Sequence, residues 1–171
     1  MIITPDCEIT TLDKVIPKQI VRDTHYDLSG RLSLVSSILD DDTTRALIHF
    51  DEDGPKYDII KNPKSFTVLK YNQEPTLEID QSEKFGINYN NIHEKNGLII
   101  RNADTWIMTV ALSQSHFSFR DKGYYDLNKG SLVNSIDLLS EVAIFGKWEL
   151  YIQDTNLPHT EKVKIASFQQ E

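Results

Sequence analysis

Hydrophobic and polar residues alternate along most of this chain, a pattern that predicts β-strands with one buried face. In RLSLVSSIL, residues 31–39, Leu32 and Leu34 share one face and Ser33 lies on the other. Similar alternation occurs in residues 45–50, 65–71, 76–80, 116–119, 145–155 and 163–168. Residues 97–101 and 106–112 are apolar on both faces, as in strands that are covered on both sides. Such closely spaced short strands predict an all-β fold, an antiparallel β-sandwich or jelly roll.

Turn-forming residues separate the expected strands. Gly, Pro, Asn and Asp concentrate in residues 51–58, 61–65, 72–76 and 120–126, where we expect connections. Residues 81–97 form a longer polar stretch, which we expect to be a surface loop. The whole chain, residues 1–171, is then interpreted as a single β-sandwich domain.

One segment departs from the period of two. In NSIDLLSEVAIF, residues 134–145, apolar side chains recur at helical spacing, and Ser135 is placed to cap a first turn that contains Asp137. We therefore expect one short helix near residues 135–143, covering one end of the sandwich.

Composition and charge narrow the classes of protein. The chain has 171 residues, of which 39% are hydrophobic and 26% charged, which is ordinary for a globular domain. No apolar run approaches the roughly 18 residues of a membrane span. The start, MIITPDCEITTLDK, lacks the basic and apolar regions of a signal peptide, so we expect synthesis in the cytoplasm and no membrane contact. A net charge of −8 without a basic cluster argues against nucleic acid as a partner.

Motifs of common catalytic sites are absent from the sequence. There is no G-x-S-x-G, no H-E-x-x-H and no glycine-rich phosphate loop, and the five histidines are far apart. We therefore predict no catalytic residues and no enzymatic activity. Folding would have to unite His49 and His116 to build a cupin-like metal site from distant strands, and this stays an alternative. Cys7 is the single cysteine, so no intrachain disulfide is expected.

Acidic residues around Gly54 and Pro55 form the best candidate for a cation site. Asp51, Asp53 and Asp58 offer the oxygen ligands that Ca²⁺ prefers, although their spacing is not that of an EF-hand loop. The alternative is a solvated hairpin turn whose charges block edge pairing. Apart from this candidate Ca²⁺, we expect no cofactor.

Aromatic residues supply candidates for contact with a partner. The outward-facing candidates are Tyr89 in the long loop, Tyr124 and Tyr125 in a turn, and Tyr151 on a strand. That strand belongs to FGKWELYIQDT, residues 145–155, where Trp148, Leu150 and Ile152 share the face opposite Tyr151. We therefore expect Trp148 to be buried and Tyr151 to face outward.

The segment YYDLNKGSLVNSIDLLSEVAIFGKWELYIQDT, residues 124–155, resembles the end of the P-domain found beside subtilisin-like proteases. That pattern is G-S-L followed by G-x-W-x-L-x-(V/I)-x-D-T, matched here by Gly130, Ser131, Leu132, Gly146, Trp148, Leu150, Ile152, Asp154 and Thr155. The resemblance implies a jelly-roll β-sandwich. The closing G-x-L-x-x-W element of the family is replaced by TEKVKIASFQQ, so calcium binding and a protease partner are not carried over.

Together these observations favour a non-enzymatic structural or assembly protein that contacts other protein subunits in a homo- or hetero-oligomer. By analogy at the level of the fold, such a protein fits a small virion component of a tailed phage, in the neck, tail, baseplate or capsid decoration. One alternative is a carbohydrate- or Ca²⁺-binding jelly-roll module. A second alternative is an enzyme with a metal site assembled from distant strands.

Overall fold

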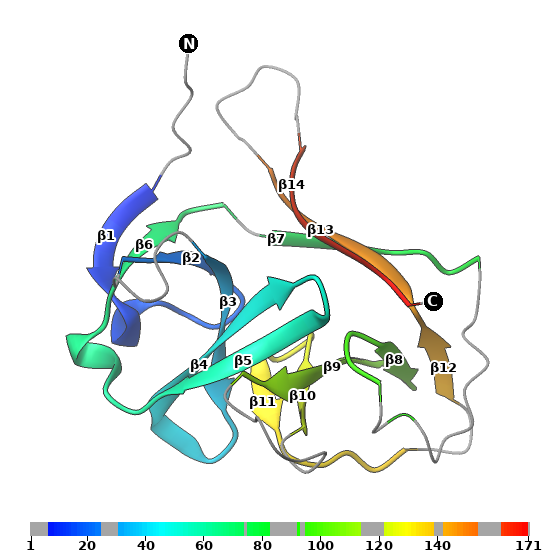
Figure 1. The fold of residues 1–171 in the computed structure, drawn as a ribbon. Helices are drawn as coiled ribbons and strands as arrows, with labels where there is room; N and C mark the ends of the chain where they lie inside the picture. The colour runs from blue at the N-terminus through cyan, green and yellow to red at the C-terminus, as the bar shows by residue number, and fades with distance from the viewer. Residues whose placement is uncertain are drawn as a thin grey trace.

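The computed structural model describes residues 7–24, 31–73, 75–82, 92, 95–113, 122–138, 142–153 and 162–170, and most of these residues are in β-strands (Figure 1). The strands are β1 (Cys7–Thr11), β2 (Ile20–Asp23), β3 (Leu32–Ile38), β4 (Asp41–Asp51), β5 (Gly54–Ile60), β6 (Thr67–Tyr71), β7 (Pro75–Ile79), β8 (Ile99–Asn102), β9 (Thr105–Leu112), β10 (Lys122–Asp126), β11 (Ser131–Val133), β12 (Val142–Phe145), β13 (Lys147–Gln153) and β14 (Lys162–Gln169). Two short 3-10 helices, η1 (Leu12–Lys14) and η2 (Pro63–Ser65), interrupt them. The prediction of an all-β fold is confirmed.

Strands β3, β4, β5, β9, β10 and β11 close into a barrel-like ring within an eleven-stranded sheet. Strands β2, β6 and β1 continue this sheet beyond β3, and β8 and β12 continue it beside β9. Neighbouring strands are antiparallel except at the contacts β5–β9 and β11–β3, which are parallel. The antiparallel arrangement that the sequence predicted is thus found at the other described contacts, and these two contacts are parallel.

The ring consists of two halves with the same pairing order. In one half, β2 lies antiparallel to the start of β3, and β3, β4 and β5 follow as antiparallel neighbours. In the other half, β8 lies antiparallel to the start of β9, and β9, β10 and β11 follow. Each parallel contact joins the last strand of one half to the first ring strand of the other. The amino-acid sequence shows no matching repeat.

A second sheet of three strands, in the order β14-β13-β7, packs over the ring (Figure 1). The largest apolar core lies between the two sheets, and Trp148, Leu150 and Ile152 enter it from β13. Trp148 is 2% exposed, stacks on Phe168 and meets Phe50 edge-on. The prediction that Trp148 is buried is confirmed, and the small sheet gives the molecule its sandwich-like layer.

The helix expected near residues 135–143 is not found in the part of the chain that the structure describes. Residues 135–138 have no helical structure, Val142–Phe145 forms β12, and residues 139–141 lie outside the described residues. Strand β12 pairs with β8 and buries Ile144. Pairing with a neighbouring strand therefore outweighs the helical spacing of the apolar side chains.

Two segments expected to be connections are strands over part of their length. Strand β5 occupies most of residues 51–58, and β10 occupies most of residues 120–126. Gly54, the first residue of β5, does complete a turn, with φ of 104°, and pairs with Asp51 of β4. Gly123 has another role, because a Cβ there would lie 2.9 Å from Leu132 Cδ1. A glycine inside a strand here marks close packing and not a turn.

Some expectations fall outside the described residues. These are the strand at residues 116–119 and residues 83–91 and 93–94 of the expected loop at 81–97. Gln81 and Ser82, which begin that loop, are exposed. The extent of the loop and the assignment of one domain to the whole chain stay predictions.

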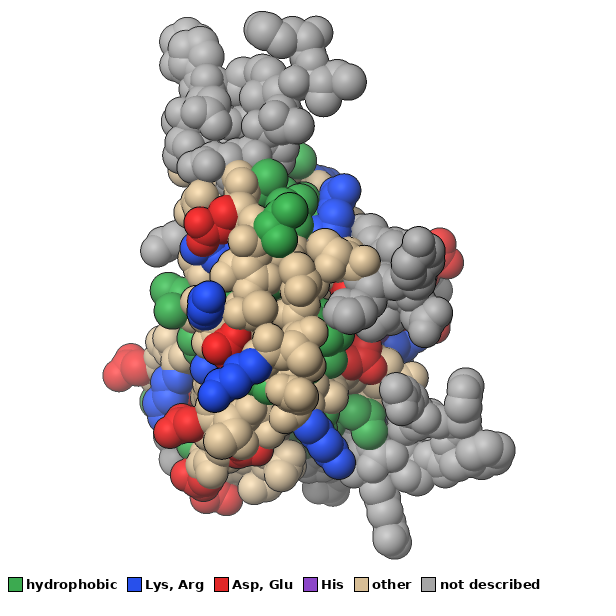
Figure 2. Space-filling view, turned by 90° about the vertical axis from the view of Figure 1, so that its left-hand side faces the viewer, with side chains coloured by type: hydrophobic (Ala, Val, Ile, Leu, Met, Phe, Trp, Pro, Cys, Tyr) green, Lys and Arg blue, Asp and Glu red, His purple; other side chains and the backbone are tan. Residues whose placement is uncertain are grey.

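The described surface carries no obvious apolar patch on the face seen in Figure 2. This face is the left-hand side of Figure 1, and its hydrophobic side chains form small separate groups among charges of both signs. The exposed large apolar side chains of the described residues are Ile9, Ile16, Leu39, Ile59 and Val163. Single exposed apolar residues are common on soluble domains, so they do not by themselves define an interaction site.

Candidate functional site

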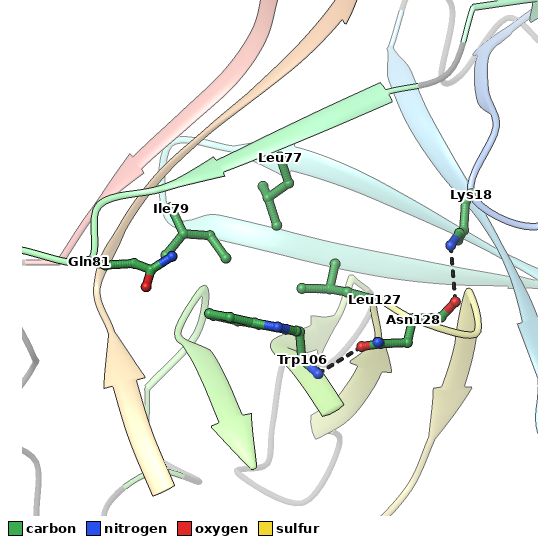
Figure 3. Close-up of a pocket in the computed structure, with 7 residues that line it drawn as sticks. All are labelled: Lys18, Leu77, Ile79, Gln81, Trp106, Leu127 and Asn128. Atoms are coloured by element: carbon green, nitrogen blue, oxygen red, sulfur yellow. Dashed lines mark hydrogen bonds between the residues drawn. The ribbon is translucent and has the colours of Figure 1, made fainter. Parts of the chain in front are cut away.

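A groove of about 510 Å³ lies between the small sheet and the ring (Figure 3). Its lining residues come from four separate segments and are Lys18, Leu77, Ile79, Gln81, Trp106, Leu127 and Asn128. Its volume falls within the range of ordinary ligand sites in proteins. The groove combines an apolar interior with polar groups at its ends, since Lys18 lies at the Leu77 end and Gln81 at the Ile79 end.

The alternation of β7 builds one wall of the groove. Leu77 and Ile79 point inward across the groove toward Trp106, while Thr76 and Glu78 are exposed. This arrangement agrees with the period of two in residues 76–80.

One edge of β7 is unpaired within the described residues. The Asp80 N–H donates to the Lys147 carbonyl at 3.0 Å, and β7 pairs with β13 and with no other described strand. Because bonding residues alternate along an antiparallel strand, Thr76, Glu78 and Asp80 bond to β13. The backbone N–H and C=O groups of Leu77 and Ile79 therefore point away from β13, along the groove.

The opposite wall is fixed by a hydrogen-bonded turn after β10. The Asp126 carboxylate accepts from the Asn128 N–H at 2.9 Å and from the Lys129 N–H at 3.0 Å. Asn128 Oδ1 accepts from the Trp106 N–H at 2.8 Å, and the Leu127 N–H donates to the Trp106 carbonyl at 2.8 Å. These bonds hold Trp106, Leu127 and Asn128 in place without a ligand.

One cation, Lys18, lines the groove, and a second, Arg101, lies beside the ring of Trp106. Lys18 Nζ donates to the Asn128 carbonyl at 3.0 Å, and the Lys18 stem packs on Gly130, where a Cβ would lie 2.6 Å from Lys18 Cγ. The Arg101 guanidinium lies 5.8 Å from the centre of the Trp106 ring, in the range of a cation–π contact. Neither cation has a carboxylate within salt-bridge distance among the residues that the structure describes.

The predicted calcium ligands do not converge on one point. Lys56 Nζ lies 3.3 Å from an Asp51 oxygen and 3.4 Å from an Asp53 oxygen, so this ammonium already balances both carboxylates. Asp58 Oδ2 instead lies 3.6 Å from His49 Nδ1. Over the described part of the chain, no group of three or more His, Cys, Asp or Glu side chains is placed to hold a metal ion. Calcium binding stays a prediction.

His49 lies at the centre of a second polar cluster that the sequence did not reveal. Ser113 Oγ lies 3.2 Å from His49 Nε2, and Asp58 lies on the Nδ1 side of the ring. Burial lowers the pKa of His49, although Asp58 and Asp51 oppose this shift. The imidazole is therefore neutral at pH 7. His116, its expected companion in a metal site, lies outside the described residues.

The cluster has the order of a nucleophile, a base and an orienting acid, but its geometry differs from that of a catalytic triad. The Ser113 hydroxyl donates to the Tyr57 carbonyl at 3.0 Å. The separation of 3.6 Å between His49 and Asp58 exceeds hydrogen-bond length, and His49 is only 3% exposed. We interpret the cluster as a buried polar network that joins β4, β5 and the end of β9.

Two of the tyrosines predicted to face outward are buried. Tyr124 and Tyr125 lie in β10, where they are 4% and 1% exposed. The expectation that they lie outward in a turn is wrong, because both faces of β10 are covered by separate parts of the core. Burial also raises the pKa of both tyrosines. Tyr89 lies outside the described residues.

Tyr151 is half-buried on the outer face of the small sheet. Its hydroxyl donates to the Glu149 carboxylate, and Lys162 Nζ lies 5.7 Å from the ring centre. The bond to Glu149 raises the pKa of Tyr151 to about 12. Its polar group is thus engaged within the sheet, and contact of Tyr151 with a partner stays a prediction.

The comparisons with family models, with curated proteins and with solved structures find no match for this chain. In the described residues, no helix is both long and apolar enough to cross a membrane. The groove is the feature of the described residues that bears most on function, and the sequence did not predict it. Its residues are dispersed from position 18 to position 128, and only the alternation of β7 offered a signal.

Proposed function

We propose that this chain is a non-enzymatic structural protein that assembles with other protein subunits through the groove beside β7. The observation that supports this most directly is the unpaired edge of Leu77 and Ile79, within the described residues, beside a groove lined by both apolar and polar side chains. Open strand edges are sites where another polypeptide adds to a sheet, and proteins commonly block them where no partner exists.

Within this class, we propose a small virion component of a tailed phage, such as a neck, tail, baseplate or decoration protein. The support is an all-β chain without catalytic motifs and with an acidic net charge of −8, which disfavours direct binding to nucleic acid. The step to a virion is an analogy of fold and composition. It implies synthesis in the cytoplasm followed by incorporation into the particle.

Sedimentation of the purified protein, alone and mixed with the products of neighbouring genes, tests the assembly role. We expect a ring, ladder or defined hetero-oligomer that Trp106→Ala weakens. Ile59→Ser, which changes an exposed residue outside the groove, is the matched control and should assemble like the wild type. A chain that stays monomeric in every mixture would overturn the proposed function.

A carbohydrate-binding module is the second candidate, because the groove presents an aromatic ring between amide side chains. Trp106 lies between Gln81 and Asn128 in Figure 3, and saccharides are commonly bound by such combinations of ring and amide. A glycan array tests this function. Binding of a defined glycan that Trp106→Ala and Gln81→Ala both remove would favour it, whereas no glycan is expected to bind if the groove serves assembly.

A further inference from the structure

We propose that the groove receives an extended strand of the partner that carries two apolar side chains at alternate positions and a carboxylate beside Lys18. This inference rests on the proposed assembly function and specifies the partner segment that the site takes. It follows from three properties of the described residues. These are the direction of the backbone groups of β7 that do not bond to β13, the side chains that line the groove, and the positive charge at the Lys18 end of the groove.

The free backbone groups dictate an extended occupant. Leu77 and Ile79 each present an N–H and a C=O away from β13, spaced two residues apart as along any strand. Pro75, which has no N–H, falls on the same outward side of β7. An added strand would lie about 4.8 Å from β7 and pair with Leu77 and Ile79 through main-chain bonds.

The lining of the groove favours apolar side chains at alternate positions of the added strand. Cross-strand neighbours share a face of a sheet, so residues opposite Leu77 and Ile79 would direct their side chains inward. There they would meet Trp106 and Leu127, which line the groove below β7 (Figure 3). Residues of the added strand between these two would face solvent on the side of Glu78.

The charges dictate an acidic residue at one end. Lys18 lies at the Leu77 end of the groove, and one of its three N–H donors is bonded to the Asn128 carbonyl. Arg101 adds a second positive charge beside Trp106. Both cations lack a carboxylate partner within the described residues, although the whole chain carries a net charge of −8. A carboxylate of the partner near Lys18 would complete the site.

Two other edge strands of the described fold, β14 and β1, lack these features. The outer edge of the small sheet, β14, carries Lys162 and Lys164, whose ion pairs with Glu78 and Glu149 cover its outer face. Charged lysines of this kind oppose strand addition. The edge strand β1 exposes Ile9, which is 75% exposed, but no residue of β1 lines the groove.

Selection from a displayed library of random eight-residue peptides tests the inference. Peptides that bind the wild-type protein are enriched, and those that also bind the Ile79→Pro variant are removed. This substitution removes one outward N–H of β7 and leaves its hydrogen bonds to β13 in place. Ile79→Val keeps that N–H and is the matched control. We expect an enriched pattern of two apolar residues separated by one, with Asp or Glu toward one end. A selection without edge-dependent peptides would overturn the inference.

Synthetic versions of an enriched peptide keep the test decisive even if Ile79→Pro does not fold. N-methylation of the amides that face β7 should weaken binding to the wild-type protein by about tenfold or more, because it removes main-chain donors. Exchanging the acidic residue for Lys should weaken binding similarly, and Lys18→Glu should reverse that preference. Equal binding of the methylated peptide would exclude strand addition.

The two proposals fail in different ways. If the chain assembles with its natural partners but yields no edge-dependent peptide, the strand inference is wrong and the assembly function stands. If the chain remains monomeric in every mixture, the assembly function is wrong whatever the library contains.

Discussion

The indole N–H of Trp148 donates a 2.7 Å hydrogen bond to the carbonyl oxygen of Gly97. Trp148 belongs to the small sheet, and Gly97 lies just before β8 of the large sheet, where its own N–H donates to the Thr109 carbonyl. This buried bond is therefore a direct polar link between the two layers of the molecule, within an otherwise apolar core. It also fixes the layer that carries β7 above Trp106.

Replacement of Trp148 by Phe should destabilise the protein. The change leaves the buried Gly97 carbonyl without its donor, which costs about 1–3 kcal/mol, and it removes volume from the contact with Phe168. Urea denaturation followed by circular dichroism measures the loss. Tyr151→Phe, on the outer face of the same strand, should cost less, and an equal loss for the two variants would contradict this account.

Gly97→Ala should destabilise the same junction through a different cause. Gly97 has φ of 79°, and a Cβ there would lie 2.6 Å from Phe168 Cζ. Backbone strain and overpacking together are expected to cost about 2–4 kcal/mol. In a double-mutant cycle with Phe168→Leu, the smaller side chain should recover the steric part but not the backbone part. Additive effects of the two substitutions would show that the ring does not cause the clash.

Local alternation was sufficient to predict much of the fold. Strands expected from the period of two correspond to β3, β4, β6, β7, β13 and β14 in the structure, and the two stretches that are apolar on both faces correspond to β8 and β9. In β13 the prediction extends to single side chains, because Trp148, Leu150 and Ile152 are all buried as their spacing requires. In a strand with one covered face, apolar and polar residues alternate, so the burial of each side chain can be predicted from the sequence of the strand alone.

The features that the sequence did not predict depend on contacts between residues that are distant in the sequence. Tyr124 and Tyr125 are adjacent and both buried, so β10 has no alternation and its Gly123 suggests a turn. The groove brings Lys18 to Asn128 across 110 residues, and Ser113 meets His49 across 64. No local sequence pattern predicts such contacts, because they form when the ring closes and the small sheet packs over it.

The stability of the protein should fall as the pH drops below about 6.5 because of His49. Burial holds the folded-state pKa of His49 below its usual value of 6.5, so the unfolded chain binds the proton first. The contribution of neutral His49 to the free energy of unfolding is therefore fully present above pH 6.5. It declines as the pH falls from 6.5 toward the lower pKa of the folded state. The facing groups are Asp58, Asp51, Arg31 and Lys56, of which the two carboxylates reduce the shift.

Urea midpoints measured between pH 7.5 and pH 5 check this sign. The wild-type midpoint should decrease with acidification, and His49→Gln should show a flatter dependence even if its midpoint is lower throughout. The comparison uses slopes, so the loss of the contact with Ser113 does not affect the conclusion. Parallel slopes for the two proteins would show that His49 is not the titrating group.

A second loss of stability is expected at lower pH, from Asp41 and Asp80. Hydrogen bonds from Thr44 and Thr43 lower the pKa of Asp41 to about 2, and those from Ser82 and Lys147 lower the pKa of Asp80 to about 2. Both folded values lie below the usual 3.8, so these carboxylates stabilise the fold above pH 3.8 and cease to do so as the pH falls through about 2.

Variants at Asp41 separate this acid step from the step caused by His49. Asp41→Asn removes the charge and should make the urea midpoint less dependent on pH between pH 4 and pH 2. The pH dependence of the midpoint above pH 5 should stay unchanged. Thr43→Val removes one donor, from Thr43 Oγ1 at 2.7 Å, and should move the Asp41 titration toward 3.8 with the charge retained. If both variants followed the wild-type curve below pH 4, the bonds to Asp41 would not couple folding to its protonation.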